Sequence, residues 1–164
     1  MASMNSGLGG PAGFGETIFS SATKASGGND DGSIQIDVTP AFGSDGINLF
    51  GTSYTDIYVN SNGLITFEGP NTSPSISSLE SLSEPAIAAF MTDINIDNGG
   101  EIYVDVDSAT GKVTITWEDV APFSGSGTNS FQVVLTNTGN GDFEIEYIFE
   151  DIEYAGSGST ARVR

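Results

Sequence analysis

Cysteine and histidine are both absent from the 164 residues of this chain. Without cysteine there is no disulfide framework and no thiolate metal site. Without histidine there is no Ser-His-Asp or Cys-His nucleophile system, and most zinc sites are excluded as well. The chain must therefore fold on a hydrophobic core alone, for which its length suffices.

Cations are scarce, because four Lys or Arg residues stand against 22 Asp or Glu residues, for a formal net charge of −18. A nucleic-acid partner needs several basic contacts to phosphate, and an anionic membrane surface attracts basic segments, so we expect neither partner. Repulsion among the acids weakens the compact state unless salt or bound cations offset it. We therefore expect a saline or calcium-containing environment.

Long apolar runs are also missing, since no segment approaches the roughly 20 apolar residues that cross a bilayer as a helix. Residues 1–15 are rich in Gly, Ser, Ala and Pro, which predicts a flexible lead-in, and they show no signal peptide. We expect residues 16–164 to form one domain with an open C-terminal boundary. Residues 161–164 are either a last strand that is cut short or the start of a strand that is completed by residues outside this sequence.

Short runs of alternating apolar and polar residues fill the rest of the chain, a pattern typical of all-β domains. These runs cover residues 33–38, 56–60, 64–67, 112–118, 130–136 and 142–149. An Asn60-Ser61-Asn62-Gly63 turn and residues 137–141 each join two runs into a hairpin. We predict an all-β fold, an antiparallel β-sandwich with long loops and at most one short helix, for which residues 77–82 are the candidate.

The acidic run at residues 93–105 suggests a further hairpin, with a loop at residues 98–100. This register separates apolar from polar side chains completely, and the loop glycines supply the positive φ that such loops need. We therefore predict the cross-strand pairs Ile96 with Ile102, Ile94 with Val104, Asp97 with Glu101, Asn95 with Tyr103, and Asp93 with Asp105.

Acidic pairs directly opposite one another destabilise a sheet, and two explanations remain open. One is a solvated face whose repulsion is screened by salt. The other is a hard cation, with calcium the first choice, bound through oxygens of Asp93, Asn95, Asp97 and Glu101. An EF-hand loop that starts at Asp93 is excluded. Such a loop needs glycine at its sixth position and glutamate at its twelfth, whereas this chain has Asn98 and Val104 there. Residues 27–32 (GGNDDG) resemble a single imperfect copy of a calcium-binding β-roll repeat.

Two carboxylates across an aromatic-lined cleft would indicate a glycosidase. Trp117 stands beside Glu118 and Asp119, but it shares a face with Val113 and Ile115, which predicts a core position. We therefore expect no enzyme. A carbohydrate- or protein-binding domain with a discrete ligand site is the alternative. An exposed aromatic cluster would favour it, and the candidates are Tyr54, Tyr58, Tyr103 and Tyr154.

Six motifs occur in order along residues 42–163: NLFG at 48–51, YVNSNGLITF at 58–67, IAAFMTD at 87–93, TWEDV at 116–120, NSFQVVL at 129–135 and YIFEDI at 147–152. Together they resemble the nidogen-type extracellular (NIDO) family. The chain departs from the family at Met91 and Tyr154, where a tryptophan is typical, and both changes look like conservative packing changes.

The resemblance implies an extracellular module of matrix, mucin-like or bacterial surface proteins, and it implies no ligand residues. The missing cysteines favour a bacterial source. We expect a non-catalytic adhesion or structural module of a larger secreted or cell-surface protein, stabilised by calcium if the cation explanation holds. The expected partners are other extracellular proteins, glycans, or neighbouring domains of the same parent chain.

Overall fold

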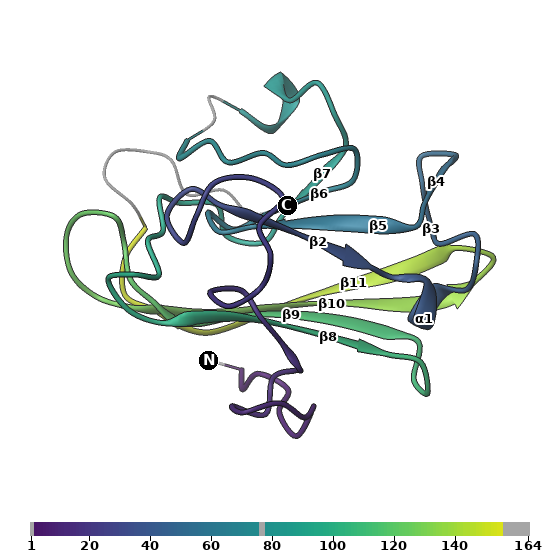
Figure 1. The fold of residues 1–164 in the computed structure, drawn as a ribbon, viewed down its shortest axis with the longest axis horizontal. Coiled ribbons are helices and arrows are strands. Elements are labelled where there is room, and N and C mark those ends of the chain that lie inside the picture. Colours follow the sequence, from purple (N-terminus) through teal and green to yellow (C-terminus); the bar gives the residue numbers. More distant parts are fainter. Residues whose placement is uncertain (1, 76–77, 156–164) are drawn as a thin grey trace.

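The computed structural model describes residues 2–75 and 78–155, and these form an antiparallel β-sandwich, as predicted (Figure 1). The strands are β1 (Thr17–Ile18), β2 (Ser33–Asp37), β3 (Ile47–Leu49), β4 (Thr52–Tyr54), β5 (Asp56–Asn60), β6 (Leu64–Thr66), β7 (Ala86–Ala88), β8 (Glu101–Asp107), β9 (Lys112–Val120), β10 (Asn129–Gly139) and β11 (Asp142–Ile152). A short helix α1 (Thr39–Phe42) and a 3-10 turn η1 (Leu79–Ser81) complete the described elements.

Two sheets form the layers of the sandwich. The larger has the order β1-β8-β9-β10-β11, and the smaller has the order β2-β5-β6-β7. The strands β3 and β4 form a separate two-stranded hairpin, which stands at one end of the sandwich (Figure 1). Two of the three hairpins that the sequence predicts, β5–β6 and β10–β11, are confirmed by antiparallel pairing.

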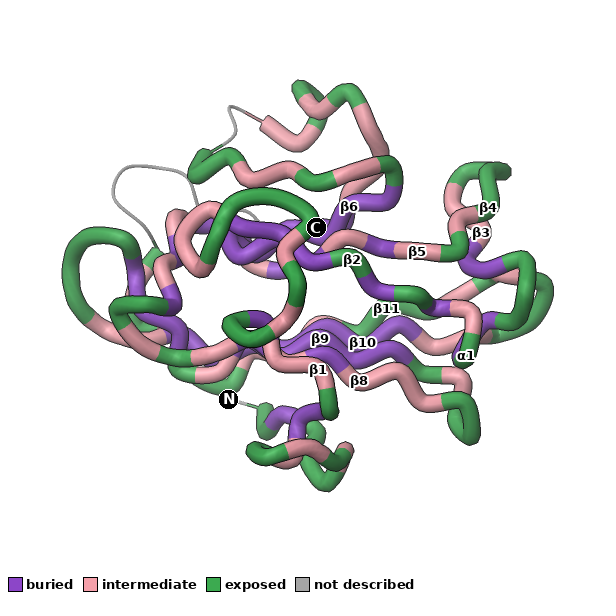
Figure 2. The backbone as a smooth tube through the Cα atoms, viewed as in Figure 1, coloured by how far each residue is buried: buried purple, intermediate pink, exposed green. Residues whose placement is uncertain are grey.

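The core lies between the sheets, where β9 and β10 are buried along most of their length (Figure 2). Trp117 is 0% exposed, which confirms its predicted core position. Its ring stacks on Phe131 with 4.9 Å between centroids, and its indole Nε1 donates to the Ser61 carbonyl at 3.2 Å. A buried indole N–H needs such an acceptor, so the core is tied to the Asn60–Gly63 turn.

The Asn60–Gly63 turn is buried, which the sequence does not predict, because turns usually lie at the surface. Asn60 and Ser61 are 0% exposed and Asn62 is 1% exposed. The Asn60 side chain donates to the Leu64 carbonyl at 2.9 Å and accepts from the Asn71 amide at 3.0 Å. The backbone of the turn is satisfied by other backbone groups, because the Ser61 amide donates to the Gly32 carbonyl, and the Thr92 and Ala89 amides donate to the Asn62 and Gly63 carbonyls.

The helix α1 is not among the predicted elements. Asp37 accepts hydrogen bonds from the Thr39 amide and hydroxyl, and Pro40 occupies the first turn, where its missing N–H costs nothing. The single helical turn η1 falls within the predicted range 77–82, of which residue 77 lies outside the described part.

The predicted hairpin at residues 93–105 is wrong. β8 pairs with β9 and β1 instead, so that Tyr103 lies opposite Thr116 and Ile18. Two successive turn bonds, from Asn98 N to Asn95 O and from Gly99 N to Ile96 O, bend the chain before such a ladder forms. Alternation correctly predicts that Ile94 and Ile96 are buried, but it does not identify the neighbouring strand.

Residues 2–15 contain no strand, yet Met4 and Phe14 pack with Val134 and Ile148 on the outer face of the larger sheet. The flexible lead-in at residues 1–15 and the single domain at 16–164 stay predictions. The alternative strand at residues 161–164 lies outside the described residues.

Gly63 has φ of +87°, and a Cβ there would lie 2.2 Å from the Phe90 carbonyl oxygen. Gly125 has φ of +104° with nothing within 4 Å of a Cβ. We predict that Gly63→Ala lowers the free energy of unfolding by roughly 2 to 5 kcal/mol, from backbone strain plus overpacking. Gly125→Ala introduces backbone strain without overpacking, so it should lower the free energy of unfolding by about 1 kcal/mol. Urea unfolding of both variants tests this, and equal losses would contradict the close approach at Gly63.

Candidate metal centre

Two loop segments meet beside the Asn60–Gly63 turn, and the Asn62 side chain of the turn joins them. Its Nδ2 donates to Asp31 Oδ1 at 2.8 Å, and its Oδ1 accepts from the Ile94 amide at 2.8 Å. An isolated β-bridge also joins Asp30 to Asn95. These contacts bring the loop at residues 27–32 against residues 92–95.

Asp30, Asp31 and Asp93 form an acidic cluster, in which one carboxylate oxygen from each lies within 4.8 Å of the others. All three residues are half-buried. Asp30 Oδ1 and Asp93 Oδ1 are buried atoms that have no hydrogen-bond partner in the described part of the chain. A buried carboxylate oxygen without a partner is costly, so this cluster fits a hard cation that accepts oxygen ligands.

Electrostatics oppose ionisation of two of these acids. Burial raises the pKa of Asp93, and the neighbouring Asp31 and Asp30 charges raise it further. Burial also raises the pKa of Asp30, with added repulsion from Asp31 and Asp97. A divalent cation between the carboxylates supplies the opposite charge that would reverse both effects.

The loop at residues 27–32 folds back tightly on itself, and this places Asp30 and Asp31 together. A Cβ on Gly27 would lie 2.1 Å from the Asp31 carbonyl oxygen, and one on Gly32 would lie 1.7 Å from the Gly28 carbonyl oxygen. Asp31 itself has φ of +51°, a conformation that few residues other than Gly, Asn and Asp adopt. The glycines are therefore a requirement of the loop that presents the two acids.

The structure places the four predicted ligands in two groups. Asp93 belongs to the cluster, Asn95 lies opposite Asp30, and Asp97 Oδ1 accepts from Asn29 Nδ2 at 2.9 Å. Glu101 instead lies on β8, where it accepts from the Ser20 amide at 3.1 Å. The ligand set Asp93, Asn95, Asp97 and Glu101 stays a prediction.

Sequence reasoning did not include Asp30 and Asp31 among the candidate ligands. The available signal was the GGNDDG run, which resembles one copy of a calcium-binding repeat. Its contact with residues 92–95 bridges more than 60 positions of the chain and depends on Asn62, so no local pattern indicates it.

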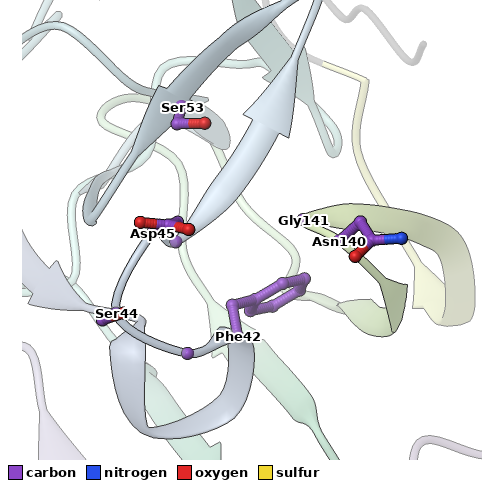
Figure 3. Close-up of a pocket in the computed structure, with 8 residues that line it drawn as sticks. Phe42, Ser44, Asp45, Ser53, Asn140 and Gly141 are labelled. Atoms are coloured by element: carbon purple, nitrogen blue, oxygen red, sulfur yellow. The ribbon is translucent and has the colours of Figure 1, made fainter.

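A second concave site lies at the other end of β2, beyond α1 (Figure 3). It has a volume of about 420 Å³ and lies between the turn after α1 and the β10–β11 turn. Four polar side chains line it without an intramolecular hydrogen bond among the described residues: Ser44, Asp45, Ser53 and Asn140. The ring of Phe42 supplies an apolar wall.

The four tyrosines do not form an exposed cluster, since each is half-buried. Tyr54 packs on Phe67 with 5.4 Å between ring centroids, and Tyr103 packs on Phe14 at 5.9 Å. Tyr154 donates its hydroxyl proton to the Val120 carbonyl at 3.0 Å. These three side chains are used in packing within the domain.

The raised pKa of Asp93 predicts a pH-dependent stability in the presence of a chelator. Ionisation is penalised in the folded state, so the penalty is absent below the ordinary Asp pKa of about 3.9 and complete above the raised value. Asp93→Asn should therefore raise the unfolding temperature at pH 7, and the gain should vanish towards pH 4.

Asp142→Asn is the matched control, because it removes the same charge at the exposed start of β11. Calorimetry in EDTA across this pH range measures both variants. A loss of stability in Asp93→Asn at pH 7 would contradict the prediction, because it would mean that the carboxylate makes a favourable contact.

Comparison with family models gives a match to the family described as NIDO related, over residues 13–163. Comparison with curated proteins and with solved structures gives no match. The family match spans both sheets and the acidic cluster, and it agrees with the resemblance carried by the six sequence motifs. The chain belongs to the NIDO-related family.

Proposed function

We propose that this domain is a non-catalytic extracellular module of a larger secreted or cell-surface protein, with an adhesive or structural role and one bound calcium ion. The observation that carries the calcium assignment is the pair of buried, unpartnered oxygens of Asp30 and Asp93 within a cluster of three acids. Family membership supports the extracellular setting. Among the described residues no helix is long and apolar enough to cross a membrane.

The chemistry of the cluster favours calcium over other cations. Its donors are carboxylate oxygens on loops, and calcium accepts six to eight such ligands in flexible geometry. Magnesium demands a near-ideal octahedron and retains several waters. The cluster contains no cysteine, histidine or methionine, so it lacks the soft ligands that copper and most zinc sites use.

A cation here would act as a clamp. Asp30 and Asp31 lie on the loop that leads into β2 of the smaller sheet, whereas Asp93 lies on the connection from β7 to β8, which crosses to the larger sheet. Binding would replace repulsion among three carboxylates by attraction to a shared ion. This end of the sandwich would then be stiffer, which suits a module that bears mechanical load or presents binding loops on a rigid scaffold.

Calcium should stabilise the domain saturably, and magnesium or sodium at matched ionic strength should stabilise it less. At a concentration 100-fold above the dissociation constant, the gain in free energy of unfolding is about 2.7 kcal/mol. Asp30→Asn and Asp93→Asn should abolish the calcium-specific gain, whereas Asp142→Asn should keep it. Thermal unfolding with calcium titrated after EDTA treatment measures this.

An equal response to every salt would contradict the calcium proposal and leave the acids as a repulsive, screened surface. Variants of Asp97 and Glu101 separate the two ligand sets. Loss of the calcium response in Glu101→Gln would favour the set predicted from sequence, whereas its retention favours Asp30, Asp31 and Asp93.

A second candidate function is binding of a neutral glycan in the concave site beyond α1. Its four unbonded polar side chains offer donors and acceptors for hydroxyl groups, and the Phe42 ring offers an apolar surface. Its volume lies within the range of small-ligand sites.

Titration with neutral mono- and disaccharides, followed by amide chemical shifts, tests this candidate. Saturable shifts at Asp45 and Asn140 that Asp45→Ala removes are the expected result, with Asp142→Asn as the charge-matched control. No saturable shift with any sugar of the panel would dismiss the candidate.

A further inference from the structure

β11 is an edge strand of unusual length. It pairs with β10 on one side, and no strand of the described residues pairs with its other side. At the opposite edge of the same sheet, β1 has only two residues. β3 covers only the start of the long edge, where the Asn48 amide donates to the Gly141 carbonyl at 2.8 Å. From residue 143 to residue 149 the ladder with β10 has no register shift.

Several of the usual devices that protect an edge are missing from the middle of this strand, although its acidic side chains oppose pairing with a second acidic strand. Proteins guard long edges with proline, lysine, a bulge or a covering segment, because unpaired N–H and C=O groups accept further strands. The sequence of β11, DFEIEYIFEDI, contains no proline, glycine or lysine. The register shifts of the β10–β11 ladder lie only near its two ends.

The core is also incomplete along the middle of this edge. Leu135 on β10 is 0% exposed, whereas Ile145 directly opposite on β11 is 38% exposed. Phe143 packs against Phe42 at one end, and Phe149 packs against Phe90 at the other. Between these two covered positions, an added strand with inward apolar side chains would bury Ile145.

The acidic side chains on the outer face of β11 determine which kind of strand can pair with it. Glu144 and Glu146 lie on this face, opposite Thr136 and Val134, and β11 carries no cation. A second copy of β11 would place acids opposite acids, which destabilises pairing. An extended segment with Lys or Arg on one face and apolar residues on the other matches both faces of the edge.

We propose that β11 is a docking edge that takes an extended, basic amphipathic segment of another protein as a sixth strand of the larger sheet. Main-chain hydrogen bonds hold such a segment, and alternate side chains give specificity. The inward apolar residues cover Ile145, and the outward basic residues face Glu144 and Glu146. The proposal is independent of the calcium site, because β11 contributes none of the three clustered acids.

The probe is a synthetic peptide of about eight residues, the length of an ordinary strand, that alternates Val and Lys. Two further peptides serve as controls: one with alternate amides N-methylated, in both registers, and one with Asp in place of Lys. Binding to the full chain is measured by calorimetry and by amide shifts at low and at physiological salt.

The expected result is saturable binding of the Val-Lys peptide, with shifts along β11 and slower hydrogen exchange of its amides. N-methylation in one register should abolish binding. Glu146→Lys should weaken binding about tenfold, from attraction changed to repulsion across the pair, and should favour the Val-Asp peptide. Glu80→Lys, an equal charge change in the short turn η1, should leave affinity within about twofold, because η1 is not on the proposed edge.

Four results would each overturn the proposal. The first is no binding by the full chain, and the second is equal binding of the N-methylated peptides, which would indicate diffuse attraction to an acidic surface. The third is binding only by a chain that ends at Ala155, which would mean that the chain's own end covers the edge. The fourth is a dimer in sedimentation whose β11 amides are already protected from hydrogen exchange without peptide, which would make a second copy the occupant.

Discussion

Asn62 is the side chain on which the arrangement of the acidic cluster depends. At 1% exposure it holds the Asp31 carboxylate with one end of its amide and the Ile94 backbone with the other. The bond from the Ile94 amide is buried, where an unpaired polar group is costly, and the bond to Asp31 is partly buried, so Asn62 holds the two segments together. Trp117 bonds to the adjacent Ser61, so the same buried turn positions both the core and the cluster.

The excess of acids has different consequences in different parts of the domain. At Asp37 and Asp107, hydrogen bonds from nearby hydroxyls and amides lower the carboxyl pKa, so these charges are accommodated locally. At Asp30 and Asp93, burial comes first and like charges add to it, so the pKa rises. Along β11 the acids face solvent and discourage pairing between copies. Net charge alone therefore does not single out a candidate site, whereas a cluster of acids that includes buried oxygens without partners does.

The fold could be predicted from the sequence further than the site could. Period-two alternation identified β2, β9, β10 and β11, and the Asn-Gly turn identified β5–β6, because these signals are local. The hairpin at residues 93–105 failed, since alternation specifies a face and not a neighbour. Of the three clustered acids, the sequence offered only Asp93 as a candidate ligand, because Asp30 and Asp31 are brought to it by a buried amide from a third segment. Long-range polar contacts of this kind leave no periodic trace.

The central claim is that Asp30, Asp31 and Asp93 share one calcium ion. The most direct measurement is anomalous diffraction from crystals of the domain grown with calcium. The account predicts a single anomalous peak about 2.3–2.6 Å from Asp30 Oδ1 and Asp93 Oδ1, the calcium–oxygen distance. No peak at the cluster, with the two carboxylates close enough to share a proton, would contradict it. The raised pKa values would then reflect a protonated acid pair.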